Sequence, residues 1–514
     1  MKKFYITTPI YYVNSSPHLG HAYTSILCDM FTRFHAMNGT KTYFLTGTDE
    51  HGDKIFKSAA KNNITPQEFV DINAKKFLDL LPILHVKNSD FIRTTDQRHK
   101  TIVQNLLQKV YDKQDIYFAE YSGKYCLGCE RYYGDDELVD NMCPDHKTVP
   151  ELIHEKNYFF KMSKYWEPLK KYINEHPDFI QPARYKNEVL GLLNMEPQDL
   201  CISRPKSRLS WGIELPFDKE YVTYVWFDAL INYISALDYP NGKLFQEFWS
   251  ESHHVIAKDI LKPHCIYWPL MLMSLNIPLP KKVVIHGYWL IDDAKMSKSV
   301  GRVVDPILYC NTYGADPFRY FLIRAMSFGK DASFSDVDFI KTCNADLSNN
   351  FGNLYARIVG LMKKNCDGKI PNLSMDLDEQ EKNIANSAAN LFSELNKAME
   401  DFEPQVYCEH LISFANSINK YIDENKPWAM AKDPTQKERL TNLLRFSLEC
   451  TVVLFIGLYP ITPQTSAQFL SELGISIDLN SIFTSTPNLN LLKTDFTLPE
   501  KVTGFPRFEA IKNG

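Results

Sequence analysis

The chain has 514 residues, of which 44% are hydrophobic and 23% are charged, and its net charge is −5. This length is ample for three or more domains, and the composition is typical of a globular protein rather than a disordered one. The slightly acidic balance does not by itself indicate a nucleic-acid partner, so any such contact must depend on local patches.

The eleven cysteines are scattered and odd in number, which argues against a disulfide framework and predicts a reducing, cytoplasmic location. The N-terminus MKKFYITTPI lacks the length and the cleavage site of a signal peptide. No apolar run of membrane-spanning length is apparent in the sequence. We therefore expect no membrane partner.

The first predicted unit is a buried strand followed by a helix. Phe4–Tyr12 is rich in β-branched and aromatic residues, and Asn14–Pro17 then supplies turn and cap residues. Apolar residues at helical spacing run from Leu19 to Phe34. The segment His18-Leu19-Gly20-His21 therefore sits where a strand turns into a helix, a place where free N–H groups and the helix dipole attract phosphates.

Gly20 permits close backbone approach, and the imidazoles of His18 and His21 can donate hydrogen bonds to phosphate oxygens as charge develops at a reacting phosphorus. Alone this motif is weak, because a histidine at such a junction is more often a cap or a packed ring. A second motif far downstream, Lys295-Met296-Ser297-Lys298-Ser299, favours the phosphate-binding interpretation over a cap or a packed ring. Its lysines are cations on flexible stems, suited to following pyrophosphate as it leaves.

A second strand is predicted at Lys41–Gly47, which places Asp49, Glu50 and His51 at its carboxyl end. Ligands bind at that edge of an open parallel sheet. From composition alone, a simple capping role for these three residues is an equally good interpretation.

Near residue 116 the pattern changes to short strands, turns and cysteines, and it returns to alternating strands and helices near Tyr221. The range 116–220 is therefore predicted to be an insertion. Within it a CxxC pair is followed by a CxxH pair, a set that completes a tetrahedral shell for zinc. Because protein ligands fill all four positions, we expect one structural zinc ion per chain. The four expected ligands are Cys126, Cys129, Cys143 and His146.

The alternating pattern resumes with Tyr224–Ala229, a strand over His253–Asp259 and a helix over Ile260–Leu275. A strand over Lys282–Gly287 and a turn at Asp292-Asp293 precede the lysine-rich motif. From about residue 346 onward the apolar spacing is almost wholly helical, with helices predicted over 379–400, 405–425 and 436–458. This pattern predicts an α-helical bundle.

In this order and at this separation, the segments HLGH and KMSKS resemble the two signature motifs of class I aminoacyl-tRNA synthetases. From TTPIYYVN to the closing GFPR, nearly the whole chain resembles the methionyl-tRNA synthetases of the bacterial type with a single zinc knuckle. The resemblance implies an α/β fold in which a Rossmann-type parallel sheet is split by a zinc-containing connective insertion and followed by an all-α anticodon-binding bundle.

The resemblance also implies a division of the chain. The expected regions are 1–115 and 221–280 for the two halves of the catalytic domain, 116–220 for the insertion, 281–345 for the KMSKS and stem-contact region, and 346–514 for the anticodon-binding domain. The insertion is far too small for an editing domain of the branched-chain type.

The implied activity is an ATP-dependent ligation of L-methionine to tRNA(Met), both initiator and elongator. The methionine carboxylate attacks the α-phosphate of ATP, pyrophosphate leaves, and methionine then passes to the 3′ end of the tRNA. This chemistry requires positioning and stabilisation of charge rather than a protein nucleophile. Mg²⁺ would accompany ATP, held mainly by phosphates and water. A cytoplasmic monomer is expected.

Site residues follow from the same resemblance. The expected catalytic residues are His18, His21, Lys295 and Lys298, joined at the ATP site by Gly20, Lys258 and Asp259. The expected methionine-binding residues are Ile10, Tyr12, Asp49, Arg204, Trp226, Ala229, Leu230, Tyr233 and His264. Asp49 would hold the ammonium group, and Tyr12 and His264 would place polar tips near the sulfur. The expected anticodon-binding residues are Asn353, Arg357 and Trp428.

Without the resemblance, several of these side chains have plainer interpretations. Arg204 matches an arginine near the reacting carboxylate and phosphates, but it could equally be a surface ion-pair residue. Trp428, which follows a proline, would be interpreted as packing. The chain also departs from the family at Leu230, where some relatives have proline, and at Asp292-Asp293, where Asp-Gly is commoner.

Three alternatives stay open on the sequence alone: another class I synthetase, a stand-alone nucleotidyltransferase of the same superfamily, and a non-catalytic tRNA-binding paralogue. The short insertion and the set Asn353, Arg357 and Trp428 argue against the first. A nucleotidyltransferase would not need a long helical bundle. A non-catalytic paralogue would tolerate loss of His18, His21 or Lys298, and all three are present.

Overall fold

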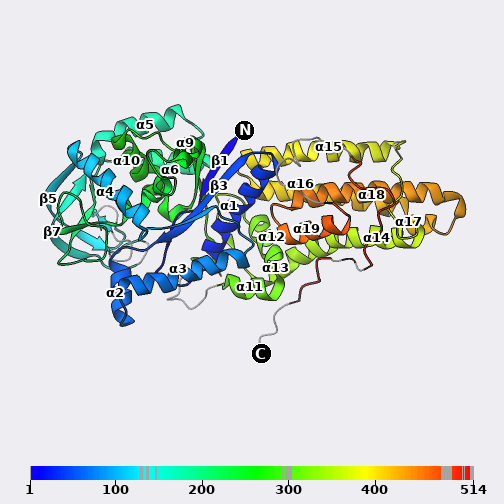
Figure 1. The fold of residues 1–514 in the computed structure, drawn as a ribbon, viewed down its shortest axis with the longest axis horizontal. Coiled ribbons are helices and arrows are strands. Elements are labelled where there is room, and N and C mark those ends of the chain that lie inside the picture. The colour runs from blue at the N-terminus through cyan, green and yellow to red at the C-terminus, as the bar shows by residue number, and fades with distance from the viewer. Residues whose placement is uncertain are drawn as a thin grey trace.

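The computed structural model describes residues 2–126, 131–134, 138–144, 147–291, 294–295, 304–374, 376–475, 489–500, 502 and 504–509. Figure 1 shows two regions that adjoin along the long axis of the molecule. An α/β region carries the N-terminus, and a bundle of long helices forms the other end. The first helix, α1 (Leu19–Met37), lies where the two regions meet.

Parallel strands form the sheet of the α/β region, in the order β2-β3-β1-β12-β13-β8, with β4 also paired to β3. All the pairings along this path are parallel. This confirms the predicted α/β class. The strands are Lys3–Thr7 (β1), Tyr11–Tyr12 (β2), Lys41–Asp49 (β3), Asp90–Arg93 (β4), Ile180–Gln181 (β8), Ser252–Ala257 (β12) and Lys282–His286 (β13).

The edge strand β8 comes from within 116–220, the range expected to form the insertion. It pairs with β13, with Ile180 opposite Val283. The flanking helices α5 (Trp166–Glu175) and α6 (Ala183–Leu192) bury Leu169 and Val189 in the same core as the parallel sheet. Part of this range therefore completes the sheet rather than standing outside it.

The other strands of that range, together with Tyr221–Thr223 just after it, form small antiparallel sheets. One has the order β6-β5-β7-β9 and the other is the ribbon β10-β11. Figure 1 places β5 and β7 at the end of the α/β region farthest from the bundle. The strands are Ile116–Cys126 (β5), Arg131–Tyr133 (β6), Glu151–Phe160 (β7), Leu200–Cys201 (β9), Ser203–Pro205 (β10) and Tyr221–Thr223 (β11).

Further helices cover the parallel sheet. They are Asp53–Lys61 (α2), Pro66–Ile83 (α3), Gln97–Asp112 (α4), Val225–Leu230 (α7), Asn232–Ser235 (α8), Lys243–Phe248 (α9) and Trp268–Leu275 (α10). The single helix expected over 260–275 is wrong in detail, because a π-helical segment, Pro263–Tyr267, precedes α10. Pro263 and Pro269 lack N–H donors, so a regular α-helical ladder cannot run through this stretch.

A three-stranded sheet of order β15-β14-β16 and three helices connect the two regions. These elements are Trp289–Ile291 (β14), Ala294–Lys295 (β15), Ala332–Ser333 (β16), Pro306–Tyr313 (α11), Ala315–Ala325 (α12) and Asp336–Thr342 (α13). A π-helical segment, Cys343–Gly352, then leads into the bundle.

The bundle confirms the predicted helices to within one residue at each end. Its helices are Asn353–Asn365 (α14), Glu379–Glu400 (α15), Pro404–Asn425 (α16), Pro427–Met430 (α17), Lys437–Leu458 (α18) and Pro463–Glu472 (α19). Asp378 and Glu381 form a capping box at the start of α15, which explains its sharp beginning.

By length and composition the segment Pro434–Leu458 contains a window apolar enough to cross a membrane, so the expectation that no such run occurs is wrong. However, 89% of its most apolar window is buried inside the protein. It contacts α14, α15, α16 and α19. It is therefore the central helix of the bundle, and its apolar surface is covered by protein.

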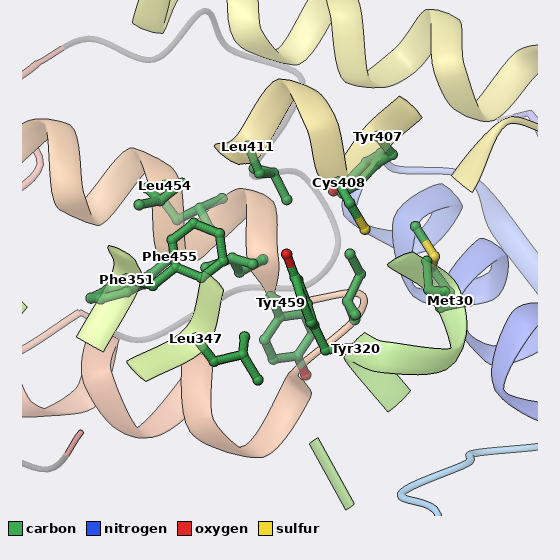
Figure 2. Packing of buried hydrophobic residues seen from close by; sticks show 14 of the residues in the cluster. Met30, Tyr320, Leu347, Phe351, Tyr407, Cys408, Leu411, Leu454, Phe455 and Tyr459 are labelled. Carbon is green, nitrogen blue, oxygen red and sulfur yellow. The ribbon is translucent and has the colours of Figure 1, made fainter. Parts of the chain in front are cut away.

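One hydrophobic core runs from the first helix into the bundle (Figure 2). Met30 of α1 lies near Cys408 of α16, and Tyr320 of α12 and Phe455 of α18 belong to the same cluster. This continuity fixes the bundle against the α/β region.

A buried ion network reinforces that contact. Arg319 of α12 is fully buried and donates to Asp29 Oδ2 of α1 at 2.7 Å. It also donates to the carbonyl oxygens of Pro460 and Ile461, just after α18, at 2.9 and 2.8 Å. Arg33 donates to the same Asp29 carboxylate at 2.7 Å. Helix α1 is thus tied directly to the bundle.

Candidate functional site

The strand predicted over Phe4–Tyr12 is divided into β1 and β2, and the chain then enters the N-terminus of α1 as predicted. His18 is the N-cap of this helix: its Nδ1 accepts a hydrogen bond from the N–H of Gly20 at 3.1 Å. His21 Nδ1 accepts from the N–H of His18 at 3.1 Å, so the two histidines form a capping box. Because both Nδ1 atoms are acceptors, each neutral ring carries its proton on Nε2.

The two rings are held close together. Their centroids lie 3.9 Å apart, and His21 also makes edge contacts with Tyr11 and Phe77. A Cβ on Gly20 would lie 3.0 Å from Cε1 of His18, so a larger residue at this position would displace the His18 ring. The result is a fixed pair of imidazoles at a helix N-terminus, where anions are stabilised.

The carboxyl ends of the strands next to β1 lie at the same edge of the sheet as the N-terminus of α1. Strands β12 and β13 lie beside β1 and run parallel to it. His286, at the end of β13, lies with its Nε2 2.9 Å from Oγ1 of Thr24 on α1. Burial lowers the pKa of His286 to about 4, so it is neutral near pH 7. This contact fixes the first turns of α1 against the sheet.

Lys258 and Asp259 directly follow β12, at this edge. Lys258 donates from Nζ to Asp331 Oδ2 at 2.6 Å, and its ammonium lies 4.5 Å from the centre of the Tyr288 ring. Lys295 lies in β15, paired with Leu290 of β14. Lys298 lies outside the described residues.

Two of the expected methionine-binding side chains contact each other directly. The Tyr233 hydroxyl lies 2.7 Å from Nε2 of His264, and His264 Nδ1 lies 2.8 Å from the Ile260 carbonyl oxygen. Nδ1–H must therefore donate to that carbonyl, and Nε2 accepts from the tyrosine. Burial lowers the pKa of His264 to about 4, so this pair is uncharged near pH 7.

The structure also describes the other expected pocket residues. Tyr12 of β2 pairs with Asp49 of β3 in the sheet register. Burial raises the pKa of Tyr233, and the nearby Asp49 carboxylate adds to this effect. Ala229 and Leu230 lie on α7, next to α8 with Tyr233. Ile10, Trp226, Leu230 and Tyr233 belong to one hydrophobic cluster.

Arg204 is fully buried, so the surface ion-pair interpretation is wrong. Its guanidinium lies 3.8 Å from the centre of the Tyr224 ring and 5.1 Å from that of Tyr125, and NH1 donates to the Ser203 carbonyl oxygen at 2.7 Å. Tyr224 immediately precedes α7, which carries Trp226. Arg204 is therefore held by aromatic rings at the base of that helix.

A buried hydrogen-bonded relay joins His51, Asp228, His99 and Ser235. The sequence alone did not indicate most of it. Asp228 of α7 accepts from His51 Nδ1 at 2.6 Å and from His99 Nε2 at 2.8 Å. His99 Nδ1 in turn lies 2.8 Å from Oγ of Ser235. Burial alone would raise the pKa of the Asp228 carboxyl, but His51 and His99 outweigh it and lower the pKa to about 2.

Glu50, which lies between Asp49 and His51 in the sequence, is also fixed by hydrogen bonds. Arg93 binds it through two hydrogen bonds, of 2.7 and 3.0 Å, and Thr48 donates to it at 2.7 Å. The residue is fully buried. The end of β3 is thus rigid on both sides of the Glu50 peptide.

Two of the four expected zinc ligands are described. Cys126 ends β5 and Cys143 lies after β6; both are buried in one small cluster with Tyr133. The thiol of Cys143 donates to the Tyr133 hydroxyl at 3.4 Å. Cys129 and His146 lie outside the described residues, and the described part of the chain holds no group of three or more potential ligands. Two buried thiols in so small a core fit a zinc site.

The expected anticodon-binding residues lie on the bundle. Asn353 is exposed at the start of α14, and Arg357, one turn later, donates to Asp423 at 2.7 Å and Asn419 at 3.0 Å on α16. Trp428 lies on α17, which follows α16, and is 44% exposed. Arg357 and Trp428 are therefore both near the C-terminal end of α16.

Family models match most of the chain. The model described as "tRNA synthetases class I (M)" matches residues 4–149 and 136–359. The model described as "DALR anticodon binding domain" matches residues 353–450. The first covers the sheet with its carboxyl edge, and the second covers most of the bundle.

Curated proteins are similar over almost the full length. The methionine–tRNA ligase of Clostridium acetobutylicum is 43% identical over 480 residues, which cover 93% of this chain and 74% of the relative. That of Bacillus subtilis is 40% identical over 521 residues, covering 99% of this chain and 78% of the relative.

Solved structures of a methionyl-tRNA synthetase are also similar to this chain over almost the full length. Mycobacterium tuberculosis methionyl-tRNA synthetase in complex with methionyl-adenylate superposes with a TM-score of 0.93 at 32% identity, covering 98% of this chain and 99% of that one. The apo form of the same synthetase gives a TM-score of 0.87 at 30% identity, with 99% of each chain covered.

Proposed function

This chain belongs to the methionyl-tRNA synthetase family, and we propose that the carboxyl edge of its parallel sheet is where L-methionine and ATP form methionyl-adenylate. The protein is a methionine–tRNA ligase. The observation that carries the assignment of the site is the fixed pair of His18 and His21 around Gly20, at the N-terminus of α1 just after β2. The Mycobacterium tuberculosis synthetase that superposes on this chain has methionyl-adenylate bound, which supports an adenylate site here.

In the first step, the methionine carboxylate attacks the α-phosphate of ATP and pyrophosphate leaves. His18 and His21 supply Nε2–H donors to phosphate oxygens beside the N-terminus of α1. Lys258, at the end of β12, is a further cation at this edge. Lys295 and Lys298 neutralise the departing pyrophosphate, a role that suits point charges on flexible stems. No protein nucleophile is required.

The methionine side chain is placed against Tyr233 and His264, a hydrogen-bonded pair that burial keeps neutral. A neutral aromatic wall suits a thioether, because sulfur makes favourable contacts with rings. Asp49, near the Tyr233 hydroxyl, holds the ammonium group. The walls come from the other expected residues: Ile10, Tyr12, Trp226, Ala229 and Leu230. Arg204, at the base of α7, is placed near the carboxylate side.

Metal ions complete the proposal. Mg²⁺ arrives with ATP and is held mainly by phosphates and water. Zinc would be held by Cys126, Cys129, Cys143 and His146, and it would stabilise a loop whose own core contains few side chains. The structural role follows from the ligand set, since four protein ligands leave no open position.

The bundle binds the tRNA. Asn353 and Arg357 on α14 and the exposed ring of Trp428 read the anticodon, an arrangement that suits unstacked loop bases. We retain the expected division of the chain, with β8 and its flanking helices α5 and α6 assigned to the catalytic region because they complete its sheet and core. The enzyme acts as a cytoplasmic monomer on initiator and elongator tRNA(Met).

The test is ATP–pyrophosphate exchange on purified protein with Mg²⁺, run with each amino acid in turn, followed by charging of tRNA(Met). We expect exchange with methionine alone and charging of both tRNAs. Exchange with a different amino acid would overturn the pocket assignment. No exchange with any amino acid, in a folded sample loaded with zinc, would favour the non-catalytic tRNA-binding protein.

A further inference from the structure

The relay of His51, Asp228, His99 and Ser235 is built from four separate elements. His51 follows β3, Asp228 lies on α7, His99 on α4 and Ser235 on α8. All four side chains are buried, and none is more than 3% exposed. Successive polar atoms lie 2.6, 2.8 and 2.8 Å apart. This is a fully connected network, and such networks hold their members in one arrangement.

The hydrogen bonds converge on Asp228 from both sides. The ionised Asp228 carboxylate can only accept, so His51 Nδ1–H and His99 Nε2–H both donate to it. His99 Nδ1 is then the acceptor for the Ser235 hydroxyl in the neutral ring. The Trp211 ring lies 5.5 Å from that of His51, and its Nε1–H donates to the Glu50 carbonyl oxygen at 2.6 Å. Asp228 and the Trp211 ring together set the orientation of the His51 ring.

The relay joins the two sides of the proposed methionine site. His51 is two residues after Asp49, the proposed ammonium-binding residue. Asp228 lies on α7 between Trp226 and Ala229, and Ser235 lies on α8 two residues after Tyr233. A change in the relay therefore changes the distance between the carboxylate that holds the ammonium group and the rings that hold the side chain.

The relay is a costly way to provide stability alone. A buried charge needs partners to compensate for lost hydration, and apolar residues of similar size often stabilise a core equally well. A buried polar network instead selects one arrangement of the elements that it joins. This argues for a role in positioning.

We propose that Asp228 and His99 are positioning residues that fix the span of the methionine site between Asp49 and Tyr233. This inference rests on the proposed function. The relay controls how well methionine fits and leaves ATP binding at His18 and His21 unchanged. Substitutions in it raise the KM for methionine while the KM for ATP stays constant.

The experiment measures both KM values by ATP–pyrophosphate exchange in Asp228→Asn, His99→Ala and His99→Gln. We expect the KM for methionine to rise about 10- to 100-fold in the first two, by analogy with the loss of hydrogen-bond partners that orient metal-binding side chains. His99→Gln, whose amide N–H can replace the donor to Asp228, should lie within about threefold of wild type. The KM for ATP should stay within twofold throughout.

Glu449→Gln is the matched control. Glu449 is also a fully buried carboxylate, bonded to Arg445 at 2.6 Å and to backbone N–H groups, but it lies on α18 in the bundle. It should lower the melting temperature without changing either KM. Exchange in the wild-type protein tests the proposed function separately, since the relay is assessed only from differences between variants.

Two results would overturn the inference. One is a KM for methionine within twofold of wild type in both Asp228→Asn and His99→Ala, with only the melting temperature lowered. The other is an equal rise in the KM values for methionine and ATP, which would indicate a general loss of structure. If Asp228→Asn does not fold, the contrast between His99→Ala and His99→Gln decides the question.

Discussion

The edge of the parallel sheet and the interior of the bundle bury their residues in opposite ways. At the sheet edge, buried side chains include His51, Asp228 and His264, each satisfied by named polar partners. Inside the bundle, α18 buries a nearly continuous apolar run against its neighbours. Apolar packing supplies stability without requiring a defined direction, whereas hydrogen-bonded networks fix orientation. Substitutions at the sheet edge should therefore affect chemistry, and those in the bundle core should affect stability.

The junction of the two regions should show the largest effect on stability. Asp29→Asn leaves Arg33 and Arg319 buried beside a neutral partner, so we expect a loss of about 3–5 kcal/mol in the free energy of unfolding. Denaturant unfolding measures this.

The matched control is Asp79→Asn, which breaks the i,i+4 ion pair between Asp79 and Lys75. This pair is on the surface, with the Asp79 side chain 56% exposed and the Lys75 side chain 72% exposed. Its loss should stay below about 1 kcal/mol. Equal losses in Asp29→Asn and Asp79→Asn would contradict the buried network's role in joining the two regions.

His21→Ala should give the largest effect on chemistry. Removing one preorganised donor typically reduces kcat by about 100- to 1,000-fold, which corresponds to about 2.7–4 kcal/mol. The loss of the capping contact costs only about 0.5–2 kcal/mol of stability. ATP–pyrophosphate exchange and thermal unfolding on the same sample separate the two effects.

Ser335→Ala is the control for His21→Ala, because Ser335 caps α13 by accepting from the N–H of Asp338. It should lose comparable stability and keep full exchange activity. A His21→Ala enzyme that is as active as Ser335→Ala would rule out the proposed catalytic role.

Trp428→Ala should affect tRNA recognition and little else. Stacking of a base on an aromatic ring contributes about 1–3 kcal/mol, so the KM for tRNA should rise while methionine activation stays unchanged. Because Trp428 is 44% exposed, its removal should hardly change stability. Charging assays at varied tRNA concentration measure the effect, with Ile72→Ala, at another exposed apolar position, as the control. A loss of exchange activity would argue against this division of roles.

The smallest effect is a pH dependence of stability that depends on Asp228. The pKa of this carboxyl is lowered to about 2 in the folded protein, below its usual value, so its contribution is complete above about pH 4 and is lost as the pH falls toward 2. The stability difference between wild type and Asp228→Asn should therefore narrow by about 1 kcal/mol between pH 6 and pH 3. Urea unfolding at both pH values tests this. A constant difference would show that the pKa is not lowered.

The parts of the fold that sequence predicted best have strong local signals. The helices α15, α16 and α18 follow long apolar periodicities, and the strand-to-helix junction at His18 has turn residues that mark it. The two-residue strand β8 could not be predicted, because so short a segment has no periodicity and pairs with β13 some hundred residues later.

Within the site, the motifs around His18 and Asp49 were readable because they follow strands directly. His99 was not, because its role depends on contacts with Asp228 and Ser235, which are more than 125 residues away in the chain. The same holds for Arg319, whose partners lie on α1 and after α18. Long-range polar contacts leave no local pattern, so only the structure reveals them.

The most direct test of the contrast between sheet edge and bundle is to measure methionyl-adenylate formation and tRNA charging on the same samples of wild type, His21→Ala and Trp428→Ala. We predict that His21→Ala slows adenylate formation, and charging with it, whereas Trp428→Ala forms adenylate at the wild-type rate and slows charging alone. If Trp428→Ala slowed adenylate formation by the same factor as charging, or His21→Ala left adenylate formation intact, the assignment of chemistry to the sheet edge and recognition to the bundle would be wrong.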